Sequence, residues 1–185
     1  MLNDALIRKS FSLKFLSKSK AVYHEIAVKR GVAIADIVVI NNHTHCYEIK
    51  SDVDSLSRLP SQVSNFSDVF NKVTLITTVK HVDKAALLIP SWWGLIIAKE
   101  AVNGEVVFNY QKKSYLNPKD TTSNLLAMLW NDELKNILNV KKISYKKSFN
   151  RDELIDVLIN NSSSKSIAQI FSTTMTQRIN RLDYT

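Results

Sequence analysis

The stretch from Ala33 to Lys50 constrains the fold more than any other part of this sequence. Its first half is rich in β-branched residues, its central Asn-Asn-His-Thr has turn chemistry, and its second half returns as another extended run. This pattern predicts a β-hairpin whose strands belong to a largely buried sheet. The apolar background makes the few charged residues within the hairpin conspicuous.

Three of these charges are expected to converge. Asp36 lies in the middle of the first strand, and Glu48 and Lys50 lie two residues apart on the second, so that both point to one face. Folding the hairpin about Asn42 or His43 brings Asp36 opposite Glu48 to within a residue. Burying uncompensated charges costs several kcal/mol each, and adjacent carboxylates repel one another. A hard divalent cation would compensate them; a buried Glu48–Lys50 pair, with Asp36 near the strand end, is the alternative.

The same residues resemble a known motif. Asp36 followed by Glu48-Ile49-Lys50 resembles the Asp…(Asp/Glu)-x-Lys signature of the PD-(D/E)XK nuclease superfamily, which has the restriction-endonuclease-like fold. Glu25 matches the acidic residue that these nucleases often carry ahead of the motif. In the superfamily's name a proline precedes the aspartate, where this chain has alanine.

Two further segments extend the resemblance. Gln62 to Phe66 resembles the Gln-x-x-x-Tyr helix motif of the RecB-like branch, with Phe66 replacing tyrosine. Residues 47–70 and 90–94 are similar to a small family of uncharacterised bacterial proteins within the superfamily.

The resemblance implies a metal-dependent hydrolysis of phosphodiester bonds. Asp36, Glu48 and the main-chain carbonyl of Ile49 would bind Mg²⁺, for which Mn²⁺ can substitute. Lys50 would orient or deprotonate the attacking water and offset charge in the transition state. The expected catalytic residues are therefore Lys50, together with Glu25 at a second metal or a metal-bound water and Gln62 near a ligand or a phosphate.

Composition bounds the partners and the compartment. The chain has 185 residues, of which 45% are apolar, which suits one domain with a real core. No apolar run approaches the roughly 18 residues of a membrane span. A single cysteine, Cys46, excludes an internal disulfide and favours a reducing cytoplasm. The net charge of +8 favours a polyanionic partner, nucleic acid first, with a basic soluble surface as the alternative. As the substrate of the nuclease that the resemblance implies, DNA is expected over RNA.

The order of patterns predicts an α/β fold with a mixed central sheet flanked by helices. This agrees with the restriction-endonuclease-like core that the resemblance implies. The segment 21–29 is ambiguous between strand and helix. Trp92 and Trp93 are expected at the start of a strand, pointing to opposite faces, and Asn103-Gly104 predicts a second hairpin. The other expected elements are helices over 3–18, 60–70 and 81–88, and strands over 73–78 and 105–110.

The remaining sequence predicts a C-terminal helical extension. We expect the nuclease-like core to span residues 1–118 and the extension to span 119–185. The extension should contain a helix over 121–139 and a last helix over 165–181. Between them, a capping box at residues 150–153 should begin a helix that continues through 154–159. It could dock on the core, grip nucleic acid or form a homodimer. A basic cluster that could contact phosphates comprises Lys141, Lys142, Lys146 and Lys147.

Two other functions remain open. The nuclease-like fold could be a catalytically silent module that binds nucleic acid. The chain could also be an RNA-directed toxin or defence nuclease, with the same chemistry on another substrate. The cost of burying Asp36, Glu48 and Lys50 without a catalytic use argues against the silent module.

Overall fold

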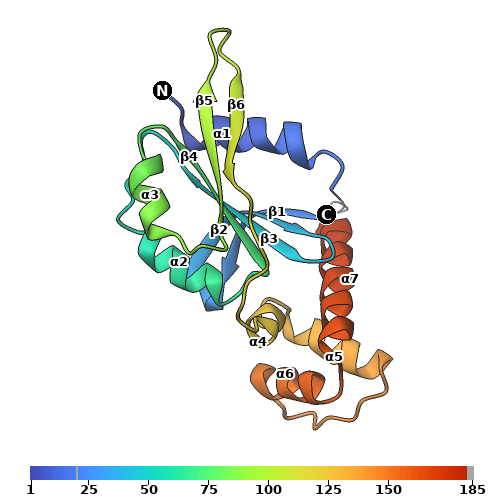
Figure 1. The fold of residues 1–185 in the computed structure, drawn as a ribbon. Coiled ribbons are helices and arrows are strands. Elements are labelled where there is room, and N and C mark those ends of the chain that lie inside the picture. The colour runs from blue at the N-terminus through green and yellow to red at the C-terminus, as the bar shows by residue number, and fades with distance from the viewer. Residues whose placement is uncertain (20, 183–185) are drawn as a thin grey trace.

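A computed structural model describes residues 1–19 and 21–182. Six strands form one mixed sheet in the order of the sequence (Figure 1). Strands β1, β2 and β3 are antiparallel, β3, β4 and β5 are parallel, and β6 returns antiparallel to β5. The predicted α/β class with a mixed sheet is confirmed. The strands are β1 (Val22–Val28), β2 (Ala33–Ile40), β3 (Thr44–Lys50), β4 (Lys72–Thr78), β5 (Gly94–Glu100) and β6 (Val106–Lys112).

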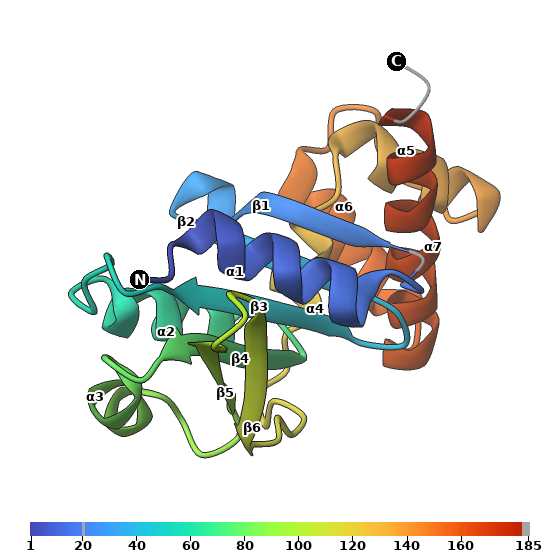
Figure 2. The ribbon, with the colours of Figure 1, turned by 90° about the horizontal axis from the view of Figure 1, so that it is seen from above.

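Helices cover both faces of the sheet (Figure 2). Helix α1 (Asp4–Phe11) packs Ile7 and Phe11 against one face and continues as a π-helical turn, Ser12–Leu16. The other face carries the crossover helices and the C-terminal extension. These helices are α2 (Leu59–Ser67), α3 (Val82–Leu88), α4 (Thr122–Leu126), α5 (Asn131–Val140), α6 (Arg151–Asn160) and α7 (Ser164–Leu182).

The predicted hairpin is confirmed as β2 and β3, with Ile40 paired to Thr44 and Ile37 to Tyr47. Its alternate residues enter two different apolar clusters, because successive side chains of a strand point to opposite faces. Both faces are covered by helices, which explains why β2 is almost continuously apolar.

The ambiguous segment near residue 25 is strand β1, and a short 3₁₀ turn (Lys29–Gly31) joins it to β2. The expectation that Trp92 and Trp93 begin a strand is wrong, because β5 starts at Gly94. Trp93 is fully buried, and its indole Nε1 donates to Ser67 Oγ at 3.2 Å. A Cβ at position 94 would lie 2.6 Å from Thr74 Oγ1, so glycine permits the close approach of β4 and β5.

The expected single helix over 121–139 is broken into α4 and α5. Arginine side chains satisfy main-chain carbonyls at the break: Arg151 Nη2 donates to Ala127 O at 2.5 Å and Arg178 Nη2 to Met128 O at 3.1 Å. Tertiary hydrogen bonds thus compensate the carbonyls that a continuous helix would pair internally. The capping box at Asn150 is confirmed at the start of α6.

The helical extension docks on the sheet. Leu129, Leu158 and Phe171 belong to the same apolar cluster as Val38 of β2 and Phe66 of α2. Tyr23 OH of β1 also donates to Met175 O of α7 at 2.7 Å. Of the three roles predicted for the extension, docking on the core is the one that the structure shows. Across the described part of the chain, no helix combines the length and apolar character needed to cross a bilayer.

Candidate metal centre

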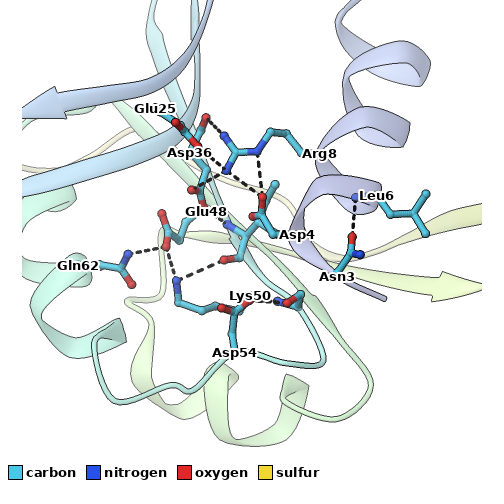
Figure 3. A network of polar contacts seen from close by, with 12 residues as sticks. Asn3, Asp4, Leu6, Arg8, Glu25, Asp36, Glu48, Lys50, Asp54 and Gln62 are labelled. Atoms are coloured by element: carbon cyan, nitrogen blue, oxygen red, sulfur yellow. Dashed lines mark hydrogen bonds and ion pairs between the residues drawn. The ribbon is translucent and has the colours of Figure 1, made fainter. Parts of the chain in front are cut away.

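The six residues predicted for catalysis and metal binding line one pocket of about 360 Å³, at the edge where β2 separates from β3 (Figure 3). These residues come from three strands and helix α2, so the fold brings together positions that are distant in the sequence. They are Glu25, Asp36, Glu48, Ile49, Lys50 and Gln62. Asp54, which follows β3 in the sequence, also lines the pocket. The sequence did not identify the remaining lining residues, which are Asp4, Arg8, Ile34 and Arg58.

Asp36 lies where the hairpin opens. Regular pairing of β2 with β3 ends at Ile37 and Tyr47, and continuing that register by one residue places Asp36 opposite Glu48, as predicted. Beyond this point a side chain replaces the backbone pairing: Asp36 Oδ2 accepts a hydrogen bond from the Ile49 N–H at 2.8 Å. Burial raises the pKa of Asp36, although this hydrogen bond and the Arg8 guanidinium act in the opposite direction.

Glu48 is the most buried acid of the pocket, with 1% of its surface exposed. Its Oε1 accepts from Lys50 Nζ and, at 2.5 Å, from Gln62 Nε2. Its Oε2 is buried and has no hydrogen-bond partner among the residues that the structure describes. Burial, aided by the charge of Asp36, raises the pKa of Glu48 to about 8, more than Lys50 lowers it. Such an acid is protonated at neutral pH unless a further cation binds it.

Helix α2 positions Gln62 toward Glu48. Pro60 lies in the first turn of α2, and Phe66, one turn beyond Gln62, is fully buried. The aromatic position of the resembled Gln-x-x-x-Tyr motif is therefore a core residue here. Gln62 Oε1 is itself buried without a partner in the described part of the chain, which leaves an acceptor facing the site.

Glu25 is placed at the pocket by an unusual backbone conformation. Its φ of 52° lies in the left-handed region, uncommon for a residue other than glycine. The flanking pairs, His24 with Ile37 and Ile26 with Ala35, set it across from Asp36. Its side chain is mostly exposed and lies 3.7 Å from the Arg8 guanidinium.

The donor set suits a hard cation. Two carboxylates and the Ile49 carbonyl supply only oxygen atoms, the ligands that Mg²⁺ prefers. Within this set, the Oε2 of Glu48 is buried and has no hydrogen-bond partner in the part of the chain that the structure describes. In residues 1–19 and 21–182, no three acidic, histidine or cysteine side chains cluster as a ready metal site. The chain's own cations contact the acids instead: Arg8 contacts Asp36, while Lys50 contacts Glu48 and, at 3.2 Å, Ile49 O.

A larger cavity of about 680 Å³ lies at the turn of the β2–β3 hairpin, against the first half of α7. Asn41, Asn42 and Ser172 are typical of its lining, which is mainly amides, hydroxyls and apolar groups. It contains one acid, Asp120, and no buried charge pair. We place the candidate site at the smaller pocket because that pocket gathers the perturbed ionisable groups.

The predicted basic cluster is not part of this pocket. Its four lysines are exposed in and around the connection between α5 and α6. In both views this connection lies on the far side of the C-terminal helices from α2 (Figures 1 and 2). Lys141 Nζ donates to Ser166 Oγ at 3.2 Å, and Lys146 lies over the Phe149 ring.

The fold and the pocket define an α/β protein with a helical extension and a buried acid–lysine site on its β-hairpin. A model of the family described as bacteriophage P4 protein cII matches residues 2–183, and the chain belongs to that family. It is 28% identical over 174 residues to "Protein cII" of Enterobacteria phage P4. That match includes 94% of this chain and 65% of the relative, so the chain spans less than two thirds of the relative's length.

Among solved structures, a protein of unknown function from Silicibacter pomeroyi is similar with a TM-score of 0.41 and 12% identity. The similarity includes 70% of this chain and 84% of that protein.

Proposed function

We propose that this protein is a metal-dependent nuclease that hydrolyses phosphodiester bonds, with DNA the favoured substrate. One observation carries the proposal: four side chains converge on a single pocket, namely Asp36, Glu48, Lys50 and Gln62. In this pocket Glu48 is almost fully buried, and its Oε2 has no hydrogen-bond partner in the described part of the chain. A buried charged cluster is costly, and hydrophobic replacement would often be neutral or stabilising. Use of the cluster for chemistry accounts for that cost.

Asp36, Glu48 and the Ile49 carbonyl would hold Mg²⁺ or Mn²⁺. A bound ion would lower the pKa of a water and offset charge on the phosphate. Gln62 holds the Glu48 carboxylate from the α2 side. Lys50 is buried beside that carboxylate, where its ammonium can donate to the attacking water or to a phosphate oxygen and stabilise developing charge.

A silent nucleic-acid-binding module is the rival function. The pairing of Arg8 with Asp36 and of Lys50 with Glu48 favours it, because the chain's own cations already contact both acids. The two functions differ in one respect that can be measured, since only the nuclease changes the covalent structure of its substrate.

The test is incubation of the purified protein with labelled single- and double-stranded DNA and RNA, in Mg²⁺, Mn²⁺ or EDTA. We expect cleavage of DNA in Mg²⁺ or Mn²⁺ and none in EDTA. Cleavage of RNA alone would support the toxin or defence function. Binding without cleavage of any substrate would support the silent module, and cleavage that persists in excess EDTA would exclude the metal mechanism.

A second prediction concerns the basic cluster at residues 141–147. If it contacts phosphates, replacing its four lysines with glutamine should flatten the dependence of log affinity on log salt. The slope is about −0.9 per neutralised phosphate on duplex DNA. Single-turnover cleavage at saturation should change little. The control is Lys84→Gln with Lys99→Gln, which removes exposed charge from α3 and β5. An unchanged slope in the quadruple variant would exclude the extension from the nucleic-acid surface.

A further inference from the structure

Arg8 lies inside a ring of carboxylates contributed by three different elements (Figure 3). Its Nη2 is 3.0 Å from Asp4 Oδ1 of α1, 3.0 Å from Asp36 Oδ1 of β2 and 3.7 Å from Glu25 Oε1 of β1. Its Nε also donates to Asp4 Oδ1 at 3.1 Å, and its Nη1 donates to the Asp36 carbonyl at 2.9 Å. The guanidinium is therefore fixed at the centre of an acidic group.

This position is separate from the one around Glu48. Lys50 contacts Glu48 and the Ile49 carbonyl, whereas Arg8 contacts the opposite side of Asp36. Asp36 is common to both positions, through Oδ2 at the Ile49 N–H and Oδ1 at Arg8. The pocket thus has two places where oxygen atoms gather around a positive charge.

The Arg8 position has the chemistry of a cation site. Three carboxylates surround one guanidinium, and Arg8 is in contact with all three of them. The side chains of Arg8 and Asp36 are only 17% and 19% exposed, so water screens the attraction between these two charges incompletely. Removing the guanidinium would leave carboxylate oxygens from Asp4, Glu25 and Asp36, which are ligands for a hard divalent ion.

We propose that the Arg8 guanidinium takes the place of a second metal ion in this pocket. The protein would then bind a single divalent ion, at Asp36 and Glu48. This inference rests on the proposed metal-dependent function and specifies the number of metal ions bound per protein chain. It assigns Glu25 and Asp4 to holding Arg8. Because Arg8 anchors Asp36 through both its carboxylate and its carbonyl, Arg8 is also a positioning residue for the proposed metal ligand.

The test counts Mn²⁺ ions by calorimetry and by electron paramagnetic resonance of free Mn²⁺, with no nucleic acid present. Wild-type protein should bind one ion. Arg8→Gln should bind two, since its carboxylates then need another cation. Arg8→Lys keeps a positive charge and should bind one. Adding Glu25→Gln to Arg8→Gln should return the count to one, and because Glu25 is mostly exposed, that change should not disturb folding.

The matched control is Arg58→Gln, which removes the same charge from the rim of the same pocket. Arg58 makes no ion pair with any residue in the described ranges, and its variant should still bind one ion. Thermal melts followed by circular dichroism establish that each variant is folded.

Each remaining outcome overturns a specific claim. Two ions in the wild type, or one ion in a folded Arg8→Gln variant, would overturn the assignment of Arg8 and leave the metal-dependent function standing. No ion in either protein would overturn both.

Discussion

Lys50→Gln should lose cleavage by on the order of 10²–10³-fold, the size expected when one preorganised donor to a transition state is removed. Affinity for nucleic acid should change little, because a group that acts in the transition state contributes little to ground-state binding. Lys50 is almost fully buried between Glu48 and the Ile49 carbonyl, so it cannot serve as a general surface charge. Single-turnover rates at saturating protein and equilibrium binding measure the two quantities separately.

Lys84→Gln is the control for this prediction, since it removes the same charge from an exposed position on α3. It should leave the cleavage rate unchanged. Equal losses of affinity and rate in Lys50→Gln would show that Lys50 only binds nucleic acid, which would contradict the proposed role.

The second large effect concerns the stability of the metal-free protein. The pKa of Glu48 is raised from 4.5 to about 8 by burial and by Asp36, so the folded protein retains a proton that the unfolded chain loses. The stabilisation from this proton is complete below about pH 4.5 and is lost as pH rises through about 8. Each unit of pKa difference corresponds to about 1.4 kcal/mol. The free energy of unfolding should therefore fall by several kcal/mol across that window.

Glu48→Gln cannot titrate and should not lose stability over this range. Urea melts of both proteins in EDTA, at several pH values between 5 and 8, give the difference directly. Burial lowers the pKa of His45 to about 3, so His45 makes both proteins less stable as the pH falls. Because this effect is the same in both proteins, it does not contribute to the difference between their free energies of unfolding. A difference that does not change with pH would show that Glu48 is ionised throughout. Adding Mg²⁺ at pH 8 should restore stability to the wild type only, because the ion binds the ionised carboxylate.

The sequence was most informative in the hairpin. The β-branched run, the central turn and the spacing of Asp36 from Glu48 were enough to predict both strands, their register to within a residue and the convergence of charge. Gln62 was placed from the helical pattern that follows Pro60, combined with the resemblance to a nuclease motif. These features are local or depend on a single turn, which is why they can be predicted from the chain alone.

Arg8 could not be predicted in the same way. It lies on the helix that covers one face of the sheet, and it reaches the pocket only because the β2–β3 pairing ends beside it. The one available signal was its i, i+4 spacing from Asp4, which is typical of exposed helices. The break between α4 and α5 has a similar origin, because the arginines that satisfy its carbonyls come from α6 and α7.

The most direct test of the proposed function compares wild-type protein with Asp36→Asn in a single-turnover cleavage assay on end-labelled duplex DNA, in Mg²⁺ and in EDTA. Asparagine keeps the size of the side chain and an acceptor for the Ile49 N–H, but removes the charge that would hold the cation. We predict cleavage by the wild type in Mg²⁺ alone and no detectable cleavage by a folded Asp36→Asn variant. Equal cleavage by the two proteins, or cleavage by the wild type in EDTA, would contradict the metal centre at the hairpin.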